Sequence, residues 1–147
     1  MKRHAYRLIA LLVLTGGLAA AAEAQTAGHI QLRATIPFEF NVGQKTMPAG
    51  EYTITQINPS SDRTVLQLRS NDGRNATVVQ MNNVMGKAGD GARLVFNRYG
   101  SQNYFSQAWT SADGNGWQAP KSNAESRARQ ELTRIKPESV TVALSVR

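Results

Sequence analysis

The stretch from Ile30 to Tyr52 constrains the fold of this chain more than any other. From Ile30 to Val42 every second residue is apolar, and the residues between them are polar except at Pro37. Because successive side chains of a strand point to opposite faces, the pattern predicts a long strand with one face on a core and one in water. Proline cannot donate to a ladder, so Pro37 indicates an edge strand or a bulge. The stretch indicates a fold class but not a function.

The first 24 residues are typical of a secretory signal peptide. Lys2, Arg3 and Arg7 make the start of the chain positive, and an apolar run follows from Leu8. Ala22-Glu23-Ala24 then matches an A-x-A cleavage site. A membrane anchor is the alternative, but the apolar run is shorter than the roughly 20 residues that a spanning helix needs. We therefore expect residues 1–24 to be removed and the mature chain to be periplasmic or extracellular.

The mature chain, residues 25–147, is expected to be a single domain that can bury about two thirds of its unfolded surface. It contains no cysteine, so no disulfide can form and the hydrophobic core alone must stabilise it. Its 14 basic and 9 acidic residues give a net charge of +5. This charge favours anionic partners, but a charge of this modest size is more often a solvated basic surface without a partner. No second apolar segment is long enough for a transmembrane helix.

Short alternating segments separated by turn residues fill most of the domain. Asp72-Gly73 between two such segments predicts a hairpin whose central residues both have positive φ. Gly100-Ser101 predicts another, whereas residues 111–120 are Gly/Asn-rich and are expected to be irregular. Beyond the first strand, the predicted strands are Glu51–Ile57, Thr64–Arg69, Asn75–Met81, Arg93–Tyr99, Asn103–Thr110 and Val140–Val146.

One helix is predicted before the last strand. Ser122 and Glu125 form a capping box, in which the hydroxyl and the carboxylate each accept from a free backbone amide. The helix is expected to run about three turns and to end before Pro137. The domain is thus predicted to be mainly β, an antiparallel β-sandwich or a small β-barrel of about seven strands.

The order of several motifs resembles that of a family of small bacterial proteins that carry signal peptides. The motifs cover nearly all of the mature chain and are Pro37-Phe-x-Phe-x-Val-Gly43, Met47-Pro-Ala-Gly-x-Tyr52, Leu94-Val-Phe-x-Arg-Tyr-Gly100, Tyr104-Phe, Trp109 and Pro120-Lys-Ser122. The resemblance implies export and a β fold. It brings no activity and no site residue with it.

The sequence predicts no catalytic, cofactor-binding or metal-binding residue. The mature chain has one histidine, His29, close to its new terminus, and no cysteine, which disfavours triad, thiol and zinc chemistry. The segment Asp113-Gly-Asn-Gly116 resembles the start of a calcium loop. However, Trp117 and Ala124 stand where further ligands are needed, so a plain turn is the better interpretation. Residues 86–91 lack the pattern of a phosphate loop.

Two alternatives to a non-catalytic module remain open. A small glycan-active hydrolase could use Glu39 and Glu51 if their carboxyl groups lie about 5–10 Å apart. Glu39, however, lies on the solvent face of its strand, where a charge is expected anyway. An outer-membrane barrel is the second alternative, although the predicted strands of about six residues are shorter than the 9–11 that such a barrel needs.

Aromatic and basic residues gather between positions 93 and 117 and form the candidate ligand face. Planar rings stack on sugars or bases, and arginine pairs with phosphate or carboxylate. Core packing is the competing interpretation, most of all for Trp109, whereas Trp117 lies in an irregular stretch and is expected to be the more exposed ring. The candidate residues are Arg93, Arg98, Tyr99, Tyr104, Trp109 and Trp117.

The sequence as a whole favours an exported, non-catalytic binding or structural module without a cofactor. Its partner is expected to be an anionic polymer, a glycan or another envelope protein. The basic residues in and after the helix are countered by nearby glutamates, which indicates a solvated face and not a specific nucleic-acid reader.

Signal-peptide cleavage gives the first testable prediction. When the full chain is produced in a Gram-negative host, mass spectrometry of the exported protein is expected to give a chain that begins at Gln25. An intact Met1 terminus in the membrane fraction would show that the first 24 residues are an anchor instead.

Overall fold

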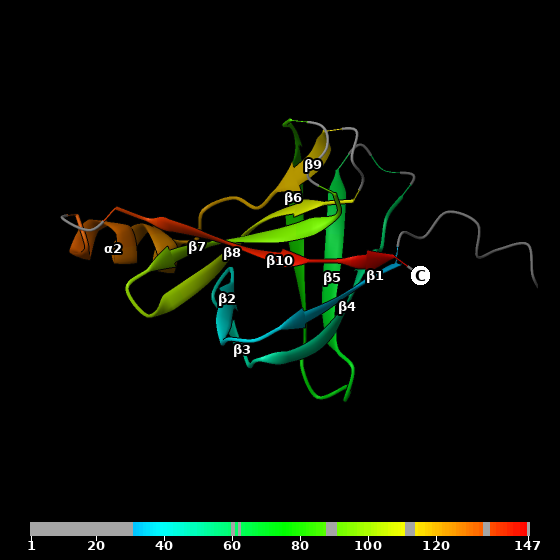
Figure 1. Ribbon diagram of the computed structural model, residues 1–147, viewed down its shortest axis with the longest axis horizontal. Coiled ribbons are helices and arrows are strands. Elements are labelled where there is room, and N and C mark those ends of the chain that lie inside the picture. The colour runs from blue at the N-terminus through cyan, green and yellow to red at the C-terminus, as the bar shows by residue number, and fades with distance from the viewer. Residues whose placement is uncertain are drawn as a thin grey trace, which may run out of the picture.

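The computed structural model describes residues 31–59, 61, 63–87, 91–110, 114–133 and 136–146. These residues form a mainly β structure of eleven short strands with helix α2 before the last two strands (Figure 1). The elements are β1 (Gln31–Ile36), β2 (Phe40–Val42), β3 (Lys45–Met47), β4 (Gly50–Gln56), β5 (Thr64–Ser70), β6 (Ala76–Met85), β7 (Arg93–Tyr99), β8 (Gln102–Trp109), β9 (Asn115–Gln118), α2 (Asn123–Glu131), β10 (Glu138–Ala143) and β11 (Ser145–Val146).

The strands form an open sheet with the order β10-β7-β8-β9-β6-β5-β4-β1-β11. The pairs along this path are antiparallel, and β2 adds one parallel contact to β8 as well as an antiparallel pairing with β3, so the sheet is mixed. The closed small barrel that the sequence allowed is therefore wrong. The two ends of the path, β10 and β11, are consecutive segments of one chain, separated by Leu144.

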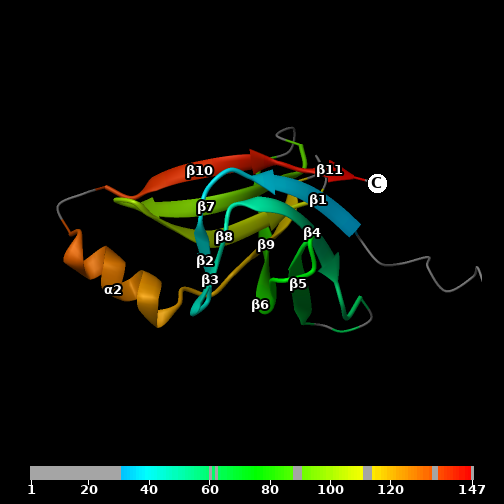
Figure 2. The same ribbon diagram turned by 90° about the horizontal axis from the view of Figure 1, so that it is seen from below.

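Two long segments each pair with strands from two different sections of the sheet. The first half of β6 pairs with β5 as far as Met81, and its second half, Asn82–Met85, pairs with β9. Likewise, β10 pairs with β7, while β11 pairs with β1. In Figure 2 the C-terminal segment, drawn in red, runs along β7 and continues beside β1. These segments connect a β11-β1-β4-β5 section with a β9-β8-β7-β10 section.

The core is built by the alternation that the sequence shows. In β1 the side chains of Leu32, Ala34 and Ile36 are buried and those between them are exposed. At the centre, the Phe96 ring packs edge-to-face on Phe40 and Phe105, with ring centroids 5.3 and 5.8 Å apart. Such aromatic pairs stabilise a core beyond the area that they bury. One cluster of apolar side chains thus receives residues from both sections.

The predicted first strand is interrupted at Pro37. The strand β1 ends at Ile36 and β2 starts at Phe40, where Asn41 lies beside Tyr104 of β8. The chain therefore leaves one section and joins the other between these strands. Ile30, the predicted first residue of the strand, lies outside the described residues.

Three other expectations differ from the structure. Lys45–Met47, where no strand was predicted, and Asn115–Gln118, which was expected to be irregular, form strands β3 and β9. The Asp72-Gly73 hairpin is confirmed, yet only Gly73 has a positive φ, 74°, since residues 71–75 connect the strands and the two-residue turn is not formed. The Asp72 carboxylate accepts from Ser70 Oγ (2.5 Å) and from the Arg74 backbone N–H (3.0 Å). The helix spans nine residues, and within the described ranges no helix is long and apolar enough to cross a membrane.

Candidate functional site

The six residues of the candidate ligand face lie on two opposite faces of the sheet. Side chains that stand directly opposite each other on paired strands share a face. Trp109 pairs with Arg93, and Tyr104 pairs with Asn97, on the face that points away from the core. Trp117 pairs with Ala108, and Arg98 alternates with Phe96, so both lie on the core side. A bulge at Ser106 of β8 puts Tyr104 and Trp109 on the same face although they are an odd number of residues apart, which strand alternation alone did not reveal.

Helix α2 covers two of the six side chains. Tyr99 and Tyr104 are 4% and 5% exposed, and their ring centroids lie 5.9 Å apart. They form a small cluster with Ala128, against which Ala124 and Leu132 also pack. These tyrosines therefore hold the helix against the end of the β7–β8 hairpin.

Glu125 is the charged partner of this cluster. Only 4% of it is exposed, and its Oε1 accepts from Asn97 Nδ2 (2.8 Å) and from the Tyr99 hydroxyl (3.3 Å). Its backbone N–H donates to Ser122 Oγ at 3.1 Å, which confirms the first half of the capping box. A buried carboxylate is tolerated only when donors surround it. Glu125 thus joins the helix to the sheet, a role that its sequence pattern did not reveal.

Trp109 is a packing residue. It is 5% exposed, and its Nε1 donates to Gln107 Oε1 at 3.2 Å. The Arg93 guanidinium carbon lies 4.9 Å from the ring centroid. A Cβ atom placed on Gly116 or Gly86 would lie 2.4 or 2.5 Å from the indole, so the ring fills the space that these glycines leave open.

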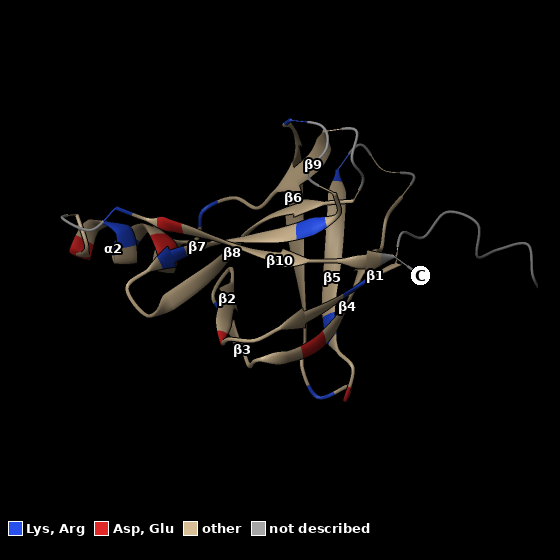
Figure 3. Cartoon of the chain, in the orientation of Figure 1, with Lys and Arg blue, Asp and Glu red and all other residues tan. Residues whose placement is uncertain are grey.

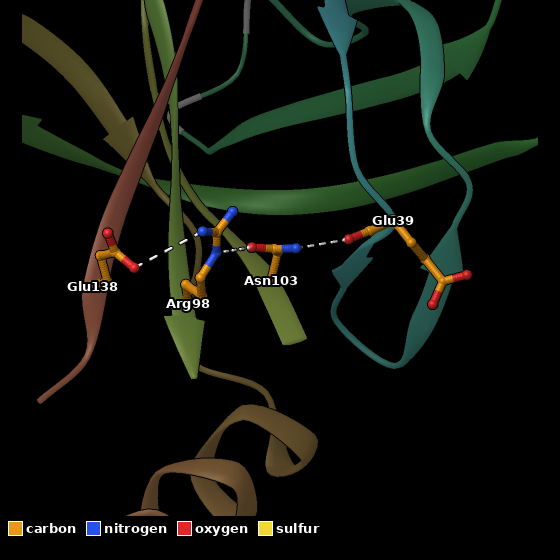
Figure 4. A network of polar contacts seen from close by, with 4 residues as sticks. All are labelled: Glu39, Arg98, Asn103 and Glu138. Atoms are coloured by element: carbon orange, nitrogen blue, oxygen red, sulfur yellow. Dashed lines mark hydrogen bonds and ion pairs between the residues drawn. The ribbon is translucent and has the colours of Figure 1, made fainter. Parts of the chain in front are cut away.

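Arg98 belongs to a network that connects four segments (Figure 4). Its Nη1 lies 3.8 Å from Glu138 Oε2, and its Nε donates to Asn103 Oδ1 at 2.9 Å. Asn103 Nδ2 in turn donates to the backbone oxygen of Glu39 at 3.0 Å. The network therefore ties β10, β7 and β8 to the start of β2. In Figure 4 the Glu39 carboxylate points away from Arg98.

The two carboxylates of the alternative hydrolase site have separate surroundings. Glu51 lies on β4 opposite Thr35, and its Oε2 accepts from Asn71 Nδ2 at 3.1 Å. Glu39 lies between β1 and β2 and contributes its backbone to the Arg98 network. Both side chains are exposed. In the described part of the chain, no group of three or more His, Cys, Asp or Glu side chains gathers as a metal site would require.

Trp117 has a different environment from the other candidate rings. It is half-buried, packs against the main core, and lines a depression of about 470 Å³. The residues beside Trp117 were not predicted, because the sequence did not indicate that β9 pairs with β6. The depression is lined by Asn83, Val84, Met85, Thr110, Asn115, Gly116 and Trp117.

Basic and acidic residues lie near one another along several parts of the chain (Figure 3). Helix α2 carries residues of both signs, and Asp72 and Arg74 share the β5–β6 turn.

Comparisons of this chain with protein-family models, curated proteins and solved structures found no match.

Because Trp109 packs against Gly116, replacing this glycine with alanine is expected to destabilise the protein, which is the opposite of the usual effect in a strand. Alanine in a strand is normally more favourable than glycine by about 0.5–1 kcal/mol. We expect Gly116→Ala instead to lower the free energy of unfolding by about 1–3 kcal/mol, since its Cβ would overlap the indole. Urea denaturation measures the change.

The Trp109→Leu background supplies the control for this effect. There the smaller side chain leaves space for a methyl group, and Gly116→Ala is expected to be nearly neutral. An equal loss of stability in both backgrounds would contradict the contact as its cause.

The tyrosines predict how stability depends on alkaline pH. Burial raises the pKa of Tyr99 and Tyr104 above 10.0, and the Glu125 charge adds to the increase. Burial and then the Asp72 charge raise the pKa of Tyr52 in the same direction. These are all the tyrosines of the mature chain. Since folding favours their neutral form, their contribution to stability is fully present below pH 10.0 and is lost as the pH rises through the folded-state pKa values.

Tyrosinate absorbance during a pH titration of the folded mature protein tests this expectation. We expect each tyrosine to be half-ionised only at a pH above 10.0, together with the loss of stability. A tyrosine that ionises below its ordinary pKa while the protein stays folded would contradict it.

Proposed function

We propose that this protein is an exported, non-catalytic binding module of the cell envelope or the extracellular space, with a glycan or another extended polymer as its ligand. The observation that carries the proposal is the environment of Trp117. This ring lies at a surface depression, whereas Trp109, Tyr99 and Tyr104 are buried by packing. Binding sites usually combine a fixed apolar surface with a few polar groups.

The sheet and core around Trp117 are suited to holding the ring in a fixed position for binding. We infer that the two sections of the sheet pack face to face as a β-sandwich, since one apolar cluster draws on both. Among the described residues, no buried side-chain nitrogen or oxygen lacks a hydrogen-bond partner. Buried polar networks that are fully satisfied make a domain rigid. A rigid frame reduces the entropy that binding must overcome.

The titratable groups with shifted pKa values support a non-catalytic role. Hydrogen bonds from Ser70 Oγ and from the Arg74 backbone N–H lower the pKa of Asp72, while burial raises the pKa of the three tyrosines. All four shifts move away from neutral pH. General acid–base catalysis requires a group whose pKa is near the working pH, so these groups stabilise turns and packing better than they would transfer protons.

Affinity electrophoresis of the mature protein through gels that contain neutral or acidic polysaccharides tests the proposal. We expect at least one polymer to retard migration without release of reducing ends. Release of reducing ends that is abolished by Glu39→Gln or Glu51→Gln would favour the hydrolase instead. Unchanged migration in every gel would contradict polymer binding.

A further inference from the structure

Four side chains from β6 and β9 form a compact patch around Trp117. Asn83 stands directly opposite Trp117, and Met85 stands opposite Asn115. Because these two pairs are two residues apart on the same strands, all four side chains share a face. Directly opposed side chains have Cβ atoms about 4.5–5.5 Å apart. We call Asn83, Met85, Asn115 and Trp117 the Trp117 patch.

The patch is open because β6 extends beyond its pairing with β5. That pairing ends at Met81, which is buried, and β9 takes over as the partner of β6 from Asn82 onward. Asn83 and Asn115 are exposed, and Met85 is 90% exposed. Trp117, by contrast, also contacts the main core. The ring is therefore held from one side while its surroundings remain accessible.

The seven described residues that line the depression over the patch are all uncharged. Two other depressions contain ionisable side chains, one Arg33 and Glu51, the other Arg69 and Asp72. A charged ligand would lose hydration at the Trp117 patch without gaining an ion pair from these seven residues. The patch is thus suited to an uncharged ligand.

We propose that the Trp117 patch binds a sugar unit of a neutral glycan, an inference that rests on the proposed binding function. A pyranose ring has an apolar C–H face, which stacks on an indole, and a rim of hydroxyl groups. The exposed Asn83 side chain offers both a donor and an acceptor, as hydroxyl groups require. Met85 is a flexible apolar side chain that adapts to the edge of the sugar ring.

The amide of Asn83 favours a sugar over a purely apolar partner. An apolar peptide or a second copy of the chain that covered the patch would take this exposed amide out of water. An amide group that is buried without a new partner lowers the affinity. A sugar supplies such a partner, and the volume of about 470 Å³ lies within the range of small-molecule sites.

Isothermal titration calorimetry of the mature protein with three neutral hexasaccharides, cellohexaose, maltohexaose and chitohexaose, tests the inference. Oligogalacturonate is the acidic comparison. We expect one of the neutral probes to bind, with an affinity that is independent of salt because no ion pair forms. Oligogalacturonate is expected to bind more weakly than that probe.

A pair of adjacent substitutions provides a matched comparison. Asn83→Ala removes an amide from the patch and is expected to weaken binding about tenfold, as the loss of a buried hydrogen-bonding partner does. Asn82→Ala removes the same group from the preceding residue, which is also exposed. The Asn82 side chain, however, lies on the other face of the strand, where it pairs with Gln118. The affinity of the Asn82→Ala variant is expected to match that of the unsubstituted protein. Trp117→Phe, which preserves an apolar ring against the core, is expected to weaken binding as well.

The outcomes separate this inference from the proposed function. If oligogalacturonate binds in a salt-sensitive way and Asn83→Ala leaves this binding unchanged, the inference of a neutral glycan is overturned. The proposed function as a binding module would still be supported. Failure of all three neutral probes overturns the inference, and unchanged migration through every polysaccharide gel would overturn the binding module too. A dimer in analytical ultracentrifugation that Met85→Lys dissociates, without neutral-glycan binding, would show that the patch is an interface between copies.

Discussion

The pairing of one C-terminal stretch with both sections of the sheet is the constraint on which the rest of the fold depends. β10 pairs with β7 over six residues, and β11 pairs with β1 only one residue later in the chain. Leu144 lies between them, and its backbone N–H donates to the Ala92 oxygen at 3.0 Å. Val140, Val142 and Leu144 pack against the core from this stretch. In a domain without disulfides, such ladders and the core they close must keep the sections together.

Strand β6 also connects the two sections, because it pairs first with β5 and then with β9, and this pairing forms the candidate site as well. A strand that ended at Met81 would pair with β5 alone. The four further residues provide a partner for β9, and their pairing places Asn83 beside Trp117. The helix, in contrast, uses Tyr99, Tyr104 and Glu125 for its own attachment. Most of the aromatic residues between positions 93 and 117 therefore maintain the fold, and Trp117 is the one that lines an open depression.

The sequence predicted those parts of the fold that depend on local patterns. The alternation of Leu32, Ala34 and Ile36 indicated β1, and the Ser122 hydroxyl indicated the start of the helix. Strands β3 and β9 were missed because they have three and four residues, and β9 contains Gly116, so their pairing partners and not their own composition determine them. The faces of the aromatic residues could not be predicted either. They depend on the bulge at Ser106 and on the register between β8, β9 and β6.

Trp109 is buried by packing whereas Trp117 lines the patch, and the indole N–H signals of the two tryptophans test this difference. The mature chain contains two tryptophans, so a ¹H–¹⁵N spectrum of the labelled protein shows two indole signals, and the spectrum of Trp117→Phe assigns them. On addition of the neutral hexasaccharide that binds, the Trp117 signal is expected to shift. The Trp109 signal, whose N–H donates to Gln107, is expected to stay in place. A shift of the Trp109 signal alone, or of neither signal with any neutral glycan, would contradict the account.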